Sequence, residues 1–284
     1  MTERDPAGAD AGLGLNRLGY AEPIERRSAR QWAGGAAVDT VDPVAKEVPV
    51  ALAYNGVPHL VMMATPESLE DFALGFSYTE GLIESAAEIR GVTVVRFSQG
   101  IELQIDVAED RMAVIQARGR RLAGRTGCGI CGAEAFRDVV REVRPVAPGC
   151  AIAGAALEAA FAALDRAQPL NAAAGAVHAA GWADPDGALA LVREDVGRHN
   201  ALDKLIGAAL RSGVVPGQGF VVVTSRASFE MAQKAARFGA PLLAAISAPT
   251  GLAIRVAEQA GMTLVGFARD NRRTVYTGFE RITA

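Results

Sequence analysis

The chain has 284 residues, half of them hydrophobic, and a formal net charge of −3. This length and composition indicate a packed globular protein of two domains. The near-neutral charge argues against nucleic-acid binding. No apolar run is long enough to span a membrane, and the acidic start has no secretory signal, so we expect a cytoplasmic protein.

Residues 1–40 mix glycine, alanine, charges and proline without a steady period, which predicts a mobile tail. A small α+β domain is expected over 41–117. It opens with two apolar runs, Val48–Tyr54 and 57–63, joined by the hairpin signal Asn55-Gly56.

A helix is expected to follow this hairpin, with Thr65 as its N-cap and Pro66 in its first turn. Its apolar face runs to about Thr79. Three short strands of an antiparallel sheet are then predicted, at 91–97, 101–107 and 112–117. The stretch 118–132 is predicted to be a loop, because it is rich in arginine and glycine.

Residues 133–284 are predicted to form an α/β domain. Two strands at 176–183 and 188–192 flank the turn 184–187, and strands then alternate with helices to residue 267. Continuous apolar strands in such an alternation imply a mostly parallel sheet covered on both faces.

Two cysteines in the predicted loop, Cys128 and Cys131, are candidates for sulfur chemistry. Four glycines between 124 and 132 leave the sulfurs little shielded. Nearby cations lower the pKa of a thiol and favour its reactive thiolate. Four arginines precede Cys128 within about ten positions: Arg118, Arg120, Arg121 and Arg125.

Four kinds of site compete for this cysteine pair. Structural zinc needs about four ligands, but the other candidates, Cys150, His59, His178 and His199, are scattered, so we expect no metal. A zinc deaminase needs His-x-Glu and Pro-Cys-x-x-Cys, which the chain lacks. A thioredoxin-type dithiol and a persulfide carrier both stay open.

Three polar clusters follow predicted strands, at 193–200, 224–228 and 269–273. Ligands of open α/β sheets bind at the carboxyl ends of the strands, where arginines and helix N-termini favour phosphate. The clusters therefore predict a phosphate-bearing ligand. Each has a plainer interpretation: surface ion pairs in the first, helix caps at Ser225 and Ser228 in the second, and a solvated turn in the third. His178 alone is typical of a core histidine.

Long motifs in the same order, from about residue 47 to the C-terminus, resemble the formate dehydrogenase accessory sulfurtransferases. The matching stretches include 62–66, 69–76, 124–132, 193–206, 225–239 and 266–277. The resemblance implies a C-terminal domain similar to the cytidine deaminase fold, without its zinc, and a homodimer.

The resemblance also implies a reaction. Sulfur passes from a cysteine desulfurase, as a persulfide on Cys128 with Cys131 as second cysteine, to the molybdenum cofactor bis(molybdopterin guanine dinucleotide) for formate dehydrogenase. The cofactor-binding segment of the family maps onto Phe267, Ala268, Arg269, Asp270, Asn271 and Arg272. We expect Ser225, Arg226 and Ser228 to assist. The alternatives are a cofactor chaperone without sulfur chemistry and a dithiol oxidoreductase.

Overall fold

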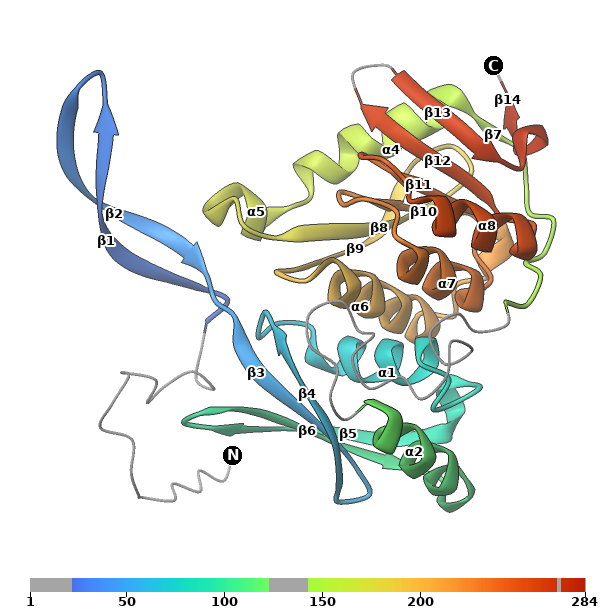
Figure 1. Cartoon of the computed structure of the whole chain (residues 1–284), viewed down its shortest axis with the longest axis horizontal. Helices are drawn as coiled ribbons and strands as arrows, with labels where there is room; N and C mark the ends of the chain where they lie inside the picture. Colours follow the sequence, from blue (N-terminus) through green and yellow to red (C-terminus); the bar gives the residue numbers. More distant parts are fainter. Residues whose placement is uncertain (1–21, 123–142, 270–271, 284) are drawn as a thin grey trace.

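The structure, a computed structural model, describes residues 22–122, 143–269 and 272–283 (Figure 1). Its first element is a long hairpin of β1 (Ile24–Ala33) and β2 (Ala36–Ala45), paired over ten positions. The prediction of a mobile tail is therefore wrong for residues 24–40, while 1–21 lie outside the described residues. The hairpin is exposed on most of both faces, so it carries no apolar alternation; its signal is Gly34-Gly35, both at positive φ.

The N-terminal domain is a four-stranded sheet in the order β4-β3-β6-β5. Its strands are β3 (Val48–Tyr54), β4 (Val57–Ala64), β5 (Ile89–Phe97) and β6 (Gly100–Val107). The outer pairs are antiparallel, as predicted, but β3 and β6 at the centre are parallel. The sheet is therefore mixed.

Helices α1 (Leu69–Thr79) and α2 (Glu109–Leu122) complete this domain. Helix α1 begins three residues later than Pro66, because Ser68 takes a left-handed conformation with φ of 52°. The strand predicted at 112–117 is wrong, since α2 covers it. Met112 and Ile115 lie one helical turn apart and both pack against the domain core.

The C-terminal domain contains a six-stranded sheet in the order β13-β12-β11-β10-β8-β9. The strands are β8 (His178–Ala183), β9 (Leu189–Asp195), β10 (Phe220–Val223), β11 (Leu242–Ala245), β12 (Thr263–Arg269) and β13 (Arg272–Thr277). The central strands β10, β11 and β12 are parallel, as predicted. The flanking pairs are antiparallel, so only the centre of the sheet is parallel.

Helices cover both faces of this sheet, which confirms the α/β class (Figure 1). One face packs against α6 (Arg198–Arg211), α7 (Phe229–Phe238) and α8 (Gly251–Ala260). The other packs against α4 (Gly154–Arg166). The remaining elements are short: η2 (Ala86–Glu88), β7 (Ile152–Ala153), α5 (Pro169–Ala174), η3 (Pro216–Gln218), η4 (Phe279–Arg281) and β14 (Ile282–Thr283). Within the described ranges, no helix has the length and apolarity that a membrane span requires.

The two domains meet where α1 crosses α6, at a pair of glycines. A Cβ on Gly75 would lie 1.7 Å from the carbonyl oxygen of Asp203, and one on Gly207 would lie 1.9 Å from that of Asp71. Real Cβ atoms never come so close, so the two helix backbones touch. We call this crossing, with the ion pairs that flank it, the joint. It fixes the N-terminal domain against the C-terminal sheet.

Candidate functional site

The three polar clusters predicted from the sequence lie on one edge of the six-stranded sheet. Strands β9 and β10 are both antiparallel to β8, so they run in the same direction, and β11 and β12 follow β10. The carboxyl ends of β9, β10 and β12 therefore share an edge, together with the start of β8. Four strand spacings, about 19 Å, separate β12 from β9. We call this the carboxyl edge; it is long enough for a dinucleotide.

Most side chains of the first cluster already have partners in the joint or in the elements next to it. Arg193 contacts Asp71 of α1 at 2.8 Å. Glu194 accepts hydrogen bonds from the backbone N–H groups of Leu170 and Asn171, at 3.0 and 2.8 Å, at the start of α5. The plainer interpretation, surface ion pairs, is therefore wrong for the start of this cluster, because Arg193 pairs with a buried carboxylate and Glu194 is bound by backbone N–H groups.

Asp195 and Lys204 form an ion pair of 2.7 Å, and both side chains are completely buried. The other oxygen of Asp195 accepts from Gly197 N–H at 2.8 Å. Lys204 also donates to the carbonyl of Thr65 at 3.0 Å, and Thr65 N–H donates to Asp195 at 3.0 Å. Burial lowers the pKa of Lys204, and the charge of Asp195 opposes this shift. These groups hold the N-terminal domain and have no capacity left for a ligand.

Of the last residues of the first cluster, His199 has a carboxylate partner among the described residues and Arg198 has none. His199 Nε2 lies 3.0 Å from Glu230 Oε2 in the first turn of α7. Burial raises the pKa of Glu230, but the contact with His199 outweighs it and the net pKa is lowered. Arg198 forms no direct ion pair with any carboxylate in the described part of the chain, and its Nε is buried without an acceptor there. Glu230 was not predicted, since an acidic residue in a first helical turn is ordinary.

His178, interpreted as a core histidine, is instead the first residue of β8 at the carboxyl edge and is half-buried. Its pKa is lowered by burial and by the nearby charges of Arg198 and His199, while Asp195 acts in the opposite direction.

The second cluster, between β10 and α7, offers one exposed cation. Thr224 Oγ1 accepts from Ala179 N–H at 2.8 Å and binds this loop to the start of β8. Ser225 is buried and donates to the carbonyl of Arg226 at 3.0 Å, while the Arg226 side chain is exposed. Ser228 occupies the N-cap of α7 but makes no capping hydrogen bond. The capping interpretation is therefore wrong for Ser225, whereas for Ser228 it is correct in position but not in hydrogen bonding.

The third cluster has an unusual backbone. Phe267 has a φ of 54°, and the pairing of β12 with β13 shifts register between Gly266 and Arg269. A bulky residue rarely adopts this conformation, which costs of order 1–3 kcal/mol. The Arg272 guanidinium lies 5.6 Å from the centre of the Phe267 ring. A half-buried ring beside an exposed guanidinium can stack on a planar ligand.

The other residues of that segment differ in exposure. Ala268 is buried and Arg269 is exposed. Arg273, which the sequence placed in the same cluster, forms an ion pair of 2.7 Å with Glu158 on α4. Asp270 and Asn271 lie outside the described residues, as do Cys128 and Cys131. Of the predicted loop 118–132, the described positions 118–122 belong to α2.

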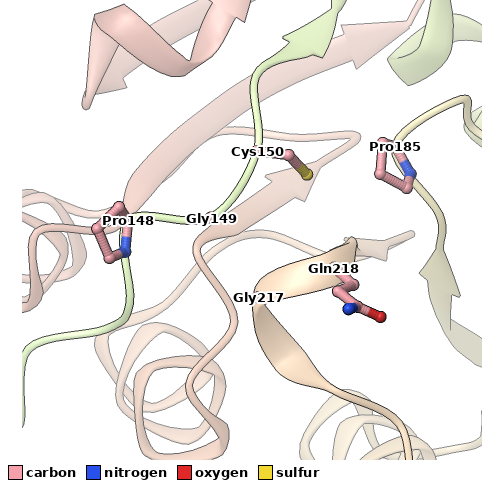
Figure 2. A pocket seen from close by; sticks show the side chains of 6 residues that line it. All are labelled: Pro148, Gly149, Cys150, Pro185, Gly217 and Gln218. Carbon is pink, nitrogen blue, oxygen red and sulfur yellow. The ribbon is translucent and has the colours of Figure 1, made fainter.

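The third cysteine, Cys150, lies in an open hollow of about 720 Å³ (Figure 2). The hollow is lined by Pro148, Gly149, Cys150, Pro185, Gly217 and Gln218. Gln218 precedes β10 and Pro185 lies in the β8–β9 turn, so the hollow is at the opposite end of the sheet from the carboxyl edge. In the part of the chain that the structure covers, no group of His, Cys, Asp and Glu is arranged to hold a metal ion.

Comparison with known proteins gives a consistent result. The model of the FdhD/NarQ family matches residues 45–283. The sulfur carrier protein FdhD of Xanthomonas axonopodis pv. citri (strain 306) is 54% identical over 256 residues, covering 90% of this chain and 91% of that protein. Its namesake from Bordetella bronchiseptica (strain ATCC BAA-588 / NCTC 13252 / RB50) is 51% identical over 243 residues, covering 86% and 88%.

A solved structure is also similar, the "Crystal structure of a putative formate dehydrogenase accessory protein from Desulfotalea psychrophila". It superposes with a TM-score of 0.74 at 26% identity, and the match covers 92% of this chain and all of that one. The similarity extends through both domains, because each falls within the matched length.

Proposed function

We propose a sulfur-carrier function on one premise: this chain belongs to the FdhD/NarQ family. The observation that carries the proposal is the identity of 54%, over nine-tenths of the chain, to proteins named as sulfur carriers. The similar solved structure bears the description of a formate dehydrogenase accessory protein, so the enzyme served would be a formate dehydrogenase. The Cys128-x-x-Cys131 pair supplies the sulfur chemistry that the role needs.

The proposed reaction has two thiol–disulfide steps. The Cys128 thiolate attacks the terminal sulfur of the persulfide on a cysteine desulfurase; a new S–S bond forms and the donor leaves as a thiolate. The Cys131 thiolate then attacks the Sγ of Cys128, forming the Cys128–Cys131 disulfide and expelling hydrosulfide to the molybdenum cofactor. A dithiol reductant must reduce the disulfide before the next cycle.

The carboxyl edge would hold the acceptor, bis(molybdopterin guanine dinucleotide), as a substrate. Arg226, Arg269 and Arg272 are exposed along it and match the phosphates of a dinucleotide, since guanidinium forks bind phosphate oxygens in pairs. The Phe267–Arg272 pair offers a stacking surface for a guanine. Within the proposal, this edge binds and orients the acceptor, and the cysteine pair supplies the sulfur.

Mass spectrometry tests the sulfur step directly. The full chain is incubated with a cysteine desulfurase and cysteine, and each cysteine peptide is weighed without reduction. We expect a gain of about 32 Da on Cys128, because accessible low-pKa thiols take up a sulfane sulfur. Cys128→Ala should abolish this gain, while the matched control Cys150→Ala should keep it. A sulfur gain on Cys150 alone, or none on Cys128, would contradict the proposal.

A second candidate function is a cofactor chaperone. The observation that favours it is that the exposed arginines of the carboxyl edge suit a phosphate-bearing cofactor whether or not sulfur is transferred. The same incubation separates the two: cofactor binding without a sulfur gain on Cys128 indicates the chaperone. A reversible Cys128–Cys131 disulfide in a protein that binds no cofactor would indicate the dithiol oxidoreductase.

We also propose that the chain forms a homodimer, as expected from the family resemblance. Each chain has a mass of 29.5 kDa, so light scattering on the purified protein should give twice that mass. A mass of one chain at micromolar concentration would contradict the dimer and leave the sulfur step untouched.

A further inference from the structure

We propose that His178, Arg198 and His199 form a proton-coupled site for a phosphate group in the β8–β9 half of the carboxyl edge. The inference deepens the proposed function, because it names where one phosphate of the acceptor binds. It rests on the described residues and does not depend on the cysteine pair. The phosphate site can therefore be disproved while the sulfur step is confirmed, and the sulfur step can be disproved while the phosphate site is confirmed.

Three elements bring the cluster together. His178 begins β8 and lies opposite Asp195, the last residue of β9, in the sheet register. Arg198 and His199 follow as the first two residues of α6. Glu230 is the second residue of α7, and its contact with His199 connects α6 to α7. The cluster thus lies where a strand start and two helix starts meet.

One cation of this cluster has no direct partner in the described part of the chain. Asp195 is already bound to Lys204, Gly197 N–H and Asn200, and Glu230 is bound to His199. Arg198 is left without a direct carboxylate partner among the described residues, and no described group accepts from its Nε. A buried donor without an acceptor is uncommon in folded proteins and calls for an explanation. An anionic ligand provides one.

The protonation of His178 responds to the charges around it. Burial, and the positive groups Arg198 and His199, hold its pKa below the ordinary value, with Asp195 opposing them. An anion bound beside these side chains adds negative charge next to the imidazole, and so raises the pKa of His178. One proton then moves from solvent to the imidazole as the anion binds. No electron transfer or leaving group is involved.

A phosphate group suits this cluster better than a carboxylate. It offers three acceptor oxygens, which a guanidinium and two imidazole N–H donors can share. Helices α6 and α7 have 14 and 10 residues, and the unpaired N–H groups of their first turns favour the same ligand. The ligand class is therefore a phosphate ester or diphosphate.

Isothermal titration calorimetry with inorganic pyrophosphate tests the site. The full-length protein is titrated at pH 7 in two buffers that differ in ionisation enthalpy, and the difference in heat gives the protons taken up. We expect uptake of roughly half a proton per chain, from the linkage between binding and a shifted pKa. His178→Gln should remove most of this uptake while the protein still binds pyrophosphate.

Arg198→Gln should weaken pyrophosphate binding at least about tenfold, the loss expected for a charge-assisted hydrogen bond. The matched control is Arg90→Gln, which removes an exposed arginine from β5 in the N-terminal domain and should leave the affinity unchanged. The melting temperatures of all three variants establish that they fold. The inference is overturned if pyrophosphate does not bind, if Arg198→Gln binds as the parent does, or if uptake persists in His178→Gln.

Discussion

The joint and the carboxyl edge use the same kinds of charged residue in opposite ways. Both draw on one stretch, 193–206, whose side chains divide between them. In the joint, Asp195 and Lys204 are fully buried and each has several partners. At the edge, Arg198 and Arg226 form no direct ion pair with a described residue. Charged residues in a motif therefore do not identify a binding site; unfilled bonding capacity does.

A second buried network makes the joint more complete. Lys234 contacts both oxygens of Asp203, at 2.8 and 2.9 Å, and also Thr79 at 2.9 Å and Glu80 at 3.1 Å. Burial alone would lower the pKa of Lys234, but the charges of Asp203 and Glu80 outweigh it and the pKa is raised. The charged groups of the joint therefore hold the two domains together, whereas those of the carboxyl edge are available to bind a ligand.

The largest effect is expected from breaking the buried pair of the joint. Lys204→Met leaves Asp195 charged and buried without its cation, which costs about 3–5 kcal/mol of folding free energy. Urea unfolding of the full chain measures the change. Lys46→Met is the matched control: it removes a lysine that lies 3.7 Å from Glu25 in a partly exposed pair, so its cost should stay below about 1 kcal/mol. Equal costs for both variants would contradict the contrast between buried and exposed pairs.

A smaller loss is expected from separating the two helices of the joint. Gly207→Ala places a methyl group where the carbonyl oxygen of Asp71 would be 1.9 Å away, so α1 must move. Overpacking of this kind costs about 1–3 kcal/mol. In Gly217→Ala the new Cβ meets no atom within 4 Å, so the same measurement should give a change within about 0.5 kcal/mol. If Gly207→Ala unfolds like its control, the helices are not in backbone contact.

The sequence indicated the centre of the C-terminal sheet because β10 and β11 are buried on both faces and read as unbroken apolar runs. It did not indicate β13, whose residues are mostly half-exposed, or the β1–β2 hairpin, which is exposed on most of both faces. The joint was also missed, because no local sequence pattern shows that Gly75 and Gly207 meet at one helix crossing. The edge was found in outline, since polar residues after buried strands are visible in sequence. The sequence did not show which of the arginines already have ion-pair partners.

The pH dependence of stability should distinguish the two ends of the molecule. The pKa of His178 at the edge and that of His59 in the N-terminal domain are both lowered, in each case chiefly by burial. Below the ordinary histidine pKa of about 6.5, the unfolded chain binds protons that the folded chain refuses, so stability falls as pH falls. For one such proton the slope is at most about 1.4 kcal/mol per pH unit.

Chemical unfolding at pH 7.5 and pH 5.5 measures this loss. His59→Gln and His178→Gln should each reduce it. Saturating pyrophosphate should cancel only the part of the stability loss that His178 causes. The anion site lies at the carboxyl edge, so pyrophosphate should not affect His59. A loss of stability that pyrophosphate does not alter, or one that both variants leave unchanged, contradicts the assignment of these two histidines.

The smallest effect on stability is expected at the edge itself. Arg226 is exposed and, among the described residues, has no ion-pair partner, so Arg226→Gln should change the free energy of unfolding by less than about 0.5 kcal/mol. The same variant should bind a guanine dinucleotide several-fold more weakly, with a smaller salt dependence, because one phosphate contact is lost. Stability and affinity therefore separate at the edge, whereas at the joint a variant such as Lys204→Met loses stability first. If Arg226→Gln lowers the unfolding free energy by more than about 1 kcal/mol, the edge is part of the structural framework and the contrast between the two regions does not hold.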